Sequence, residues 1–198
     1  MKPYIIGLTG GIASGKTAAG KVFESLGAKI IDADVISREV VKAGSVGLER
    51  LGKIFPDCVI DGELDRKRLK SVVFADEEKL ARLNAVTWNL IEEEIRRRIS
   101  GLCENDVAVL IVPLMFESGL ERYADVVVTV SAGEDVRLKR VLERDGVGEE
   151  TARSIMRSQL DDSEREKRSD YVLDGGGELS SLCASAAELY ELLTRRAD

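Results

Sequence analysis

The residues best suited to chemistry lie at positions 10–17, where the chain reads GGIASGKT. Gly10, four further residues and then Gly15-Lys16-Thr17 match the G-x-x-x-x-G-K-[ST] pattern of a phosphate-binding loop. Glycine lets the backbone curl so that successive N–H groups point at phosphate oxygens. A lysine at this spacing reaches the β- and γ-phosphates, and the hydroxyl of Thr17 can ligate Mg²⁺. The segment therefore predicts a site for ATP with Mg²⁺. Seven residues are expected to bind the nucleotide: Gly11, Ile12, Ala13, Ser14, Gly15, Lys16 and Thr17.

A phosphate loop needs a strand before it and a helix after it, and the flanking sequence predicts both. Residues 4–9, YIIGLT, predict a short buried strand, and residues 16–27 show a helical pattern that ends at Gly27. Residues 28–34, AKIIDAD, predict a second buried strand. Strand, loop, helix and strand form a βαβ unit with parallel pairing. A chance match to the loop pattern is the alternative, and this context favours a true phosphate site.

The second half of the chain continues the alternation of strands and helices. Further strands are predicted at 107–116 and 124–131, a short strand followed by a turn at 169–177, and further helices at 134–146, 148–168 and 178–195. The last helix is expected to bury a stripe made of Leu179, Leu182, Leu189, Leu192 and Leu193. The fold class is therefore α/β, a P-loop NTPase-type parallel sheet with helices on both faces.

Between the second and third strands lies a long helical block, residues 35–104. Its longest helix is predicted at about 76–100, where apolar residues recur at steps of three and four. A turn near Asp61-Gly62 interrupts the block, and no strand of the main sheet is evident in it. An insertion of this size suits a subdomain that binds a second substrate.

Two acids, Asp32 and Asp34, are expected at the carboxyl end of the second strand. Open α/β sheets bind their ligands at this end, which lies beside the phosphate loop. Alternation along a strand would place both carboxylates on the same side. Asp34 could accept the proton of an attacking hydroxyl or hold Mg²⁺. The alternative for both residues is a solvated strand end and helix cap.

Arginines are plentiful between residues 137 and 168, as in enzymes that close a lid over a transferring phosphate. Arg140 and Arg144 stand four apart and share one helix face, which makes them the favoured catalytic candidates beside Lys16 and Asp34. The alternative is a solvated charged helix, because the segment also holds many acids. The arginines are Arg137, Arg140, Arg144, Arg153, Arg157, Arg165 and Arg168.

Composition narrows the class of protein further. The 198 residues carry a formal net charge of -7, which argues against nucleic acid as a partner. The absence of histidine excludes histidine-based triads and metal sites. The three scattered cysteines predict free thiols acting as small buried hydrophobes, and no segment predicts a membrane span. We expect a cytoplasmic protein that is a monomer or a weak homo-oligomer.

An ordered set of motifs resembles the dephospho-CoA kinase family over essentially the whole chain. The segments that carry the resemblance are IGLTGGIASGKT, IIDAD, LDRKRLKSVVF, IVPLMFE, LKRVLERDG and SDYVLDGGG. It implies transfer of the γ-phosphoryl of ATP to the 3′-hydroxyl of dephospho-CoA, the last step of coenzyme A synthesis. It also implies that Asp34 is the base.

The resemblance implies three parts. Residues 1–34 and 105–198 would form the nucleotide-binding core, with a helical lid at about 145–168, and residues 35–104 would form the acceptor domain. Four positions depart from the family pattern. Thr87-Trp88-Asn89 replaces Thr-His-Pro, Ile155 stands where the lid often has arginine, Gly175 replaces asparagine and Ala13 replaces glycine. Arg153 or Arg157 could substitute for the lid arginine. Ala13 costs little if its φ is helical or extended.

Two other functions are compatible with a phosphate loop. One is a related kinase with a different acceptor. The other is a nucleotide switch or binding module without transferase activity, although the guanine-reading N-K-x-D pattern does not occur in the sequence.

Overall fold

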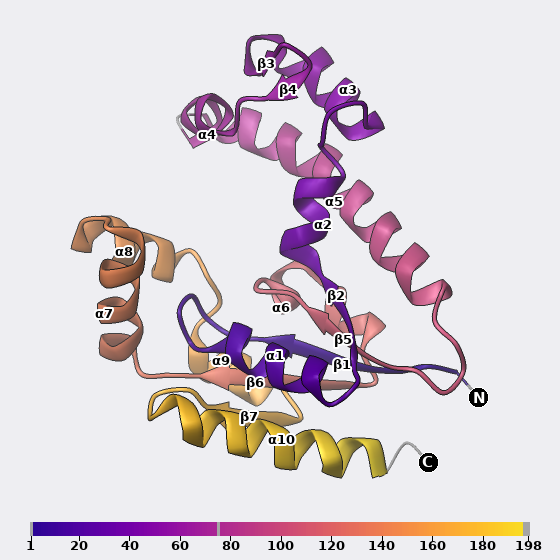
Figure 1. Ribbon diagram of the computed structural model, residues 1–198. Helices are drawn as coiled ribbons and strands as arrows, with labels where there is room; N and C mark the ends of the chain where they lie inside the picture. The colour runs from indigo at the N-terminus through magenta and orange to yellow at the C-terminus, as the bar shows by residue number, and fades with distance from the viewer. Residues whose placement is uncertain (1, 75, 196–198) are drawn as a thin grey trace. The chain divides into compact units, whose positions relative to one another are not determined.

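Five parallel strands form the sheet that carries the phosphate loop (Figure 1). They lie in the order β2-β5-β1-β6-β7, so that β1 is central. Most of β1, β5 and β6 is buried, as expected for a parallel sheet covered on both faces. The strands are β1 (Tyr4–Thr9), β2 (Lys29–Asp32), β5 (Val107–Ile111), β6 (Val126–Ser131) and β7 (Tyr171–Asp174).

The computed structural model describes residues 2–74 and 76–195, and the chain divides into two units. The core unit comprises Met1–Asp32 and Leu102–Asp198, and the inserted unit comprises Ala33–Gly101. Residues 1 and 196–198, which the predicted nucleotide-binding core included, lie outside the described residues. None of the helices in the described ranges is long and apolar enough to cross a membrane.

Helices cover both faces of the core sheet. Alternate residues of β1 face opposite ways, so Ile6 and Leu8 pack with α1 and α10, whereas Gly7 faces Met115 of α6. The predicted fold class is thus confirmed. The helices of the core unit are α1 (Lys16–Ser25), α6 (Met115–Ser118), η2 (Leu120–Tyr123), α7 (Glu134–Asp145), α8 (Glu149–Arg157), α9 (Asp162–Lys167) and α10 (Leu179–Arg195).

The inserted unit is mainly helical and has its own apolar cluster, in which Leu51 and Phe55 are buried. Its long helix matches the prediction, and Asp76 caps it by accepting from the amides of Glu78 and Lys79. The elements are α2 (Ala33–Glu39), α3 (Val46–Ile54), η1 (Pro56–Cys58), β3 (Val59–Ile60), β4 (Glu63–Leu64), α4 (Arg66–Phe74) and α5 (Glu77–Ser100).

The departure at Thr87-Trp88-Asn89 lies inside α5. Both Thr87 and Asn89 turn their side chains back onto the helix, to the carbonyls of Leu83 and Ala85. A proline at position 89 would interrupt the hydrogen-bond ladder of a helix at this point. Asparagine there allows a helix of 24 residues without a break.

The second strand is shorter than predicted. It ends at Asp32, and α2 begins at Ala33, so Asp34 lies in the first turn of a helix. The expectation that alternation along one strand places Asp32 and Asp34 on the same side is therefore wrong. Residues 33–39 form a helix and do not extend the strand, because the first turn of a helix favours a carboxylate such as Asp34 and because the helix buries Ile36.

Two other expectations need correction, and a third is confirmed. The strand predicted at 107–116 ends at Ile111, because Pro113 has no amide to extend the ladder. In α10, Leu179 and Leu192 are exposed, and the buried stripe follows Leu182, Ala186, Leu189 and Leu193. The turn predicted near Asp61-Gly62 is present: the two residues, with φ of 51° and 79°, connect the strands of the small β3–β4 hairpin.

The cysteines are free thiols, as predicted. Only Cys58 of the three is buried, however, whereas Cys183 is half-buried and Cys103 is exposed. The expectation that all three act as buried hydrophobes is therefore wrong for Cys103.

Candidate active site

The phosphate loop connects the central strand β1 to α1, and glycines fix its shape. Gly10 and Gly15 have φ of 153° and 108°, which side chains rarely tolerate. A Cβ on Gly10 would also lie 2.4 Å from the carbonyl oxygen of Val130, and one on Gly15 would lie 2.8 Å from Leu182. Since α1 starts at Lys16, its positive end faces the concave side of the loop. This arrangement suits an anion.

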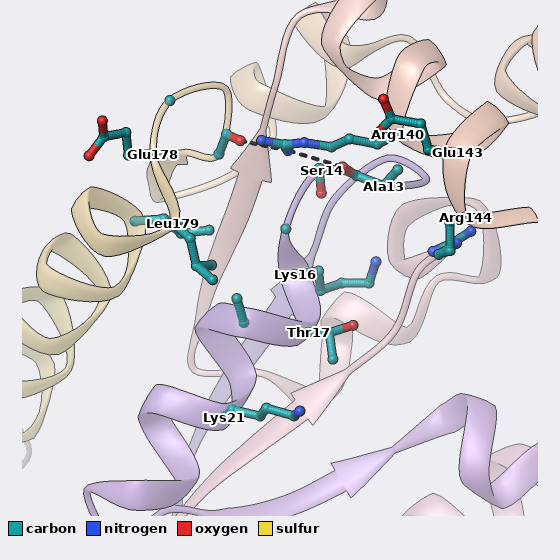
Figure 2. Close-up of a pocket in the computed structure, with 15 residues that line it drawn as sticks. Ala13, Ser14, Lys16, Thr17, Lys21, Arg140, Glu143, Arg144, Glu178 and Leu179 are labelled. Carbon is teal, nitrogen blue, oxygen red and sulfur yellow. Dashed lines mark hydrogen bonds between the residues drawn. The ribbon is translucent and has the colours of Figure 1, made fainter.

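Beside the loop lies an open pocket of about 820 Å³ (Figure 2). It brings together residues from the loop, α1, α7, the turn that follows β7 and the start of α10. The lining residues are Ala13, Ser14, Gly15, Lys16, Thr17, Ala18, Lys21, Arg140, Glu143, Arg144, Gly175, Gly177, Glu178, Leu179 and Leu182. Figure 2 shows Lys16, Thr17 and Lys21 projecting from α1 on the same side.

The pocket is positively charged although the chain is acidic. Four basic and two acidic side chains line it, against a net charge of -7 for the whole protein. In addition, the hydroxyl of Ser14 is buried and has no hydrogen-bond partner among the described residues. A buried orphan hydroxyl, a glycine-shaped loop and an excess of cations together fit a polyphosphate.

Arg140 links two parts of this site. Its guanidinium donates to the carbonyl of Ala13 at 3.2 Å and to that of Gly175 at 2.7 Å, as the dashed lines in Figure 2 show. Arg140 therefore ties the tip of the phosphate loop to the turn after β7. Arg144 lines the same pocket and forms an ion pair with Asp145 at 2.7 Å, which raises the pKa of Arg144.

Four of the other arginines in this region pair with carboxylates of the protein. Arg137 and Arg165 are buried, and both bind Asp162. Arg153 pairs with Glu149 and Glu134, and Arg168 with Glu121. The segment contains both arginines and the carboxylates that pair with them, so its sequence is compatible with a lid and with a charged structural region.

Three features of the site were not expected from the sequence. Gln159 accepts the Ile12 amide at 2.9 Å through its side-chain oxygen. Gly175 approaches the loop so closely that a Cβ there would lie 1.9 Å from the Ser14 carbonyl oxygen. Ala13 has φ of 58°, in the left-handed region, so the helical or extended φ at which alanine would cost little is not adopted here. The glycine run at 175–177 predicted the turn but not its contact with the loop, and nothing in the sequence marked the partner of Gln159.

The remaining predicted residues are placed as follows. Gly11 and Ile12 belong to the loop, with the guanidinium of Arg137 behind Gly11. Lys16 lies within 3.4 Å of the Gly10 carbonyl. Asp34 is the second residue of α2 and belongs to the inserted unit, whereas the other site residues belong to the core unit. No cluster of three or more acidic or cysteine side chains suited to a metal occurs in the described part of the chain.

The parallel sheet and the glycine-shaped loop define a nucleotide-binding protein of the P-loop class. Comparison with known proteins agrees: the family profile described as dephospho-CoA kinase matches residues 4–181. A dephospho-CoA kinase from Corynebacterium glutamicum is 40% identical over 195 residues, which cover 96% of this chain and 98% of that protein. The chain therefore belongs to the dephospho-CoA kinase family and is a phosphotransferase.

Solved structures show the same likeness along the whole chain. A Thermus thermophilus protein is 34% identical with a TM-score of 0.82, and the match covers 97% of this chain and 99% of that one. The dephospho-CoA kinase from Campylobacter jejuni is 25% identical with a TM-score of 0.71, and the match covers 98% of both chains.

Proposed function

We propose that this protein transfers the γ-phosphoryl group of ATP to the 3′-hydroxyl of dephospho-CoA, the final step of coenzyme A biosynthesis. The observation that supports this most is the positively charged pocket on the glycine-shaped loop, in a chain of the dephospho-CoA kinase family. The core unit would bind ATP, with residues 145–168 as the lid. The inserted unit would bind the acceptor.

The loop and its cations would hold the triphosphate. Backbone amides of residues 13–17 and the α1 terminus would bind phosphate oxygens, while Gly11 and Ile12 shape the loop behind them. Lys16 would neutralise charge on the β- and γ-phosphates, where negative charge must be stabilised during transfer. Arg140 and Arg144 line the same pocket from α7 and would add positive charge at the phosphates.

Thr17 and Asp34 are the residues that would hold Mg²⁺. The ion takes few protein ligands and completes its shell with phosphate oxygens and water, so a hydroxyl and one carboxylate suffice. When bound, Mg²⁺ supplies charge neutralisation at the phosphates. Asp34 would also accept the proton of the attacking ribose hydroxyl. We further propose that the protein works in the cytoplasm as a monomer or weak homo-oligomer, without nucleic acid or membrane partners.

A coupled assay of ADP release tests the reaction. Purified protein is given ATP and Mg²⁺, with and without dephospho-CoA, and the products are separated. We expect ADP release that requires the acceptor and yields coenzyme A in equal amount. Release that follows a different acceptor in a panel of alcohols would indicate a related kinase. Release that needs no acceptor would indicate a nucleotidase or switch.

Lys16→Ala tests the phosphate site. Because the ammonium group would stabilise charge at the transferring phosphate, its loss should lower turnover by roughly 10²-fold or more. The same coupled assay measures it, with Lys21→Ala as the control, since Lys21 lines the pocket farther along α1. Near-normal turnover in Lys16→Ala would place the chemistry elsewhere.

Asp34→Asn separates the two roles of this carboxylate. If Asp34 is the base, kcat should fall by roughly 10²- to 10⁴-fold while ATP affinity stays close to wild type. Titration calorimetry with Mg-ATP and initial rates measure the two quantities. An equal loss of affinity and rate would make Asp34 a metal or binding residue alone.

A further inference from the structure

We propose that Gln159 is a positioning residue for ATP binding, which fixes the tip of the phosphate loop through the Ile12 amide and couples the loop to α8. The proposal rests on the proposed function, because it concerns the same triphosphate site. It assigns a role to a residue that touches the loop from behind and does not line the pocket.

The first support is the hydrogen bond itself. The loop closes on itself where the Ser14 amide donates to the Gly11 carbonyl at 3.2 Å, which leaves Ile12 and Ala13 at its tip. The Ile12 amide is partly buried and donates to the side-chain oxygen of Gln159 at 2.9 Å. This amide is thereby turned to the protein, and Gln159 sets the direction of the loop just before its phosphate-binding residues.

The second support is apolar packing between the same two segments. The side chains of Ile12 and Ala13 pack against a cluster shared by α7 and α8. Ala152 and Met156 come from α8, directly before Gln159. Figure 1 shows α7 and α8 side by side, away from the sheet. A change in the position of α8 therefore acts on the loop through its side chains and its backbone together.

The third support is that the chain is anchored immediately after Gln159. The amide of Leu160 donates to Glu117 at 2.8 Å, and its carbonyl accepts from buried Arg165 at 2.7 Å. Asp162 binds both Arg137 and Arg165. Within the proposed lid of residues 145–168, Gln159 thus lies at the junction between the anchored residues 160–165 and α8. A movement of α8 as a lid would pivot here, beside the loop.

Glutamine also suits the position chemically. Its amide oxygen accepts a hydrogen bond without adding negative charge. A glutamate would make the same bond but would place a carboxylate one residue away from the expected phosphate-binding amides. The two functions of the residue, acceptor and neutral group, can therefore be separated by substitution.

The experiment compares Gln159→Met, which keeps the length but loses the acceptor, with Gln159→Glu, which keeps the acceptor. Ser158→Ala is the control, because its hydroxyl binds only the carbonyl of Ile155 within the helix. Hydrogen exchange of the loop peptide is measured without nucleotide, and Mg-ATP affinity by calorimetry. Initial rates give KM and kcat separately.

We expect Gln159→Met to speed exchange at residues 10–17 and to weaken ATP binding by roughly 5- to 20-fold, with kcat at saturating ATP changed less than threefold. Gln159→Glu should keep slow exchange but bind ATP more weakly than wild type. Ser158→Ala should match wild type within twofold. Unchanged loop exchange together with ATP affinity within twofold in Gln159→Met would overturn the proposal.

Two further results are informative. If Gln159→Met does not fold, Gln159→Asn, which is one methylene shorter, replaces it with the same expectations. If wild-type protein binds ATP but does not phosphorylate dephospho-CoA, the proposed function fails, while exchange and calorimetry still decide the role of Gln159.

Discussion

Replacement of Gly175 by alanine should disable the nucleotide site through a single methyl group. The new Cβ would lie 1.9 Å from the Ser14 carbonyl oxygen and 2.9 Å from Val130, whereas ordinary contact begins at 3.4 Å. The loop and the turn must therefore separate by about 1.5 Å. Gly175 cannot move freely, because its amide donates to Ser131 and its carbonyl accepts from Arg140.

The expected magnitude follows from this displacement. A misplacement of about 1 Å at a reacting group costs roughly 10²-fold in rate, so kcat/KM for ATP should fall by about that factor. Overpacking should also cost about 1–3 kcal/mol of stability. Asparagine at this position should behave like alanine, because it carries the same Cβ.

The assay is acceptor-dependent ADP release at varied ATP, with thermal unfolding followed by circular dichroism. Gly177→Ala is the matched control in the same turn, because a Cβ there meets nothing within 4 Å. A kcat/KM for ATP within threefold of wild type in Gly175→Ala would refute the reasoning, since it would show that the loop accommodates the methyl group. An equal loss in Gly177→Ala would show that filling of the pocket, and not the contact with Ser14, causes the defect.

Two further predictions concern stability, and both are measured by urea unfolding. Ala13→Gly should stabilise the protein by up to about 1 kcal/mol, because relief of the left-handed strain at φ 58° exceeds the entropy that glycine adds to the unfolded chain. A decrease of more than about 0.5 kcal/mol in the free energy of unfolding would mean that the packing of the Ala13 methyl group dominates. Glu94→Gln should lower the free energy of unfolding by about 1–2 kcal/mol at pH 7, because Arg97 and Arg98 lower the pKa of Glu94 from 4.5 to about 2. The expected loss is reduced because Arg97 is exposed, so water weakens its ion pair with Glu94. Since the pKa of Glu94 is depressed in the folded state, this stabilisation is present above about pH 4.5 and is lost as the pH falls toward 2. The difference in the free energy of unfolding between Glu94→Gln and wild type should therefore vanish near pH 2. A difference that persists at low pH would indicate a loss of packing instead.

The elements that the sequence predicts well are those whose burial pattern is one-sided or complete. Residues 4–9 and the long helix of the inserted unit emerge at almost the predicted bounds, because strong periodicity and clear end signals coincide. The carboxyl ends of β2 and β5, by contrast, differ from the predicted bounds. At the end of β2, strand and helix propensities of neighbouring residues compete, and Asp34 belongs to the first turn of α2, so the strand ends earlier than predicted. In β5 an apolar run continues past the point at which Pro113 ends the pairing.

The site divides in the same way. The loop from Gly10 to Thr17 was predictable because its chemistry lies in consecutive residues. The bonds of Arg140 to Ala13 and Gly175, and that of Gln159 to Ile12, join residues separated by up to 147 positions. No local pattern contains such information. The left-handed φ of Ala13 was not predicted either, although the resemblance, which places glycine at this position, was a signal for it.

The strand order β2-β5-β1 has a consequence for how the protein is made. β1 and β2 are synthesised first, yet they are not neighbours, because β5 lies between them and pairs with both. At ordinary rates of synthesis, roughly 4–15 s pass between the emergence of β2 and that of β5 from the ribosome. During this time the phosphate loop has no sheet on which to form. The inserted unit, by contrast, has its own apolar cluster and is complete before β5 appears. The nucleotide site therefore forms late in translation, and a nascent chain of which only residues 1–101 have emerged would carry a folded insert preceded by two unpaired strands, β1 and β2.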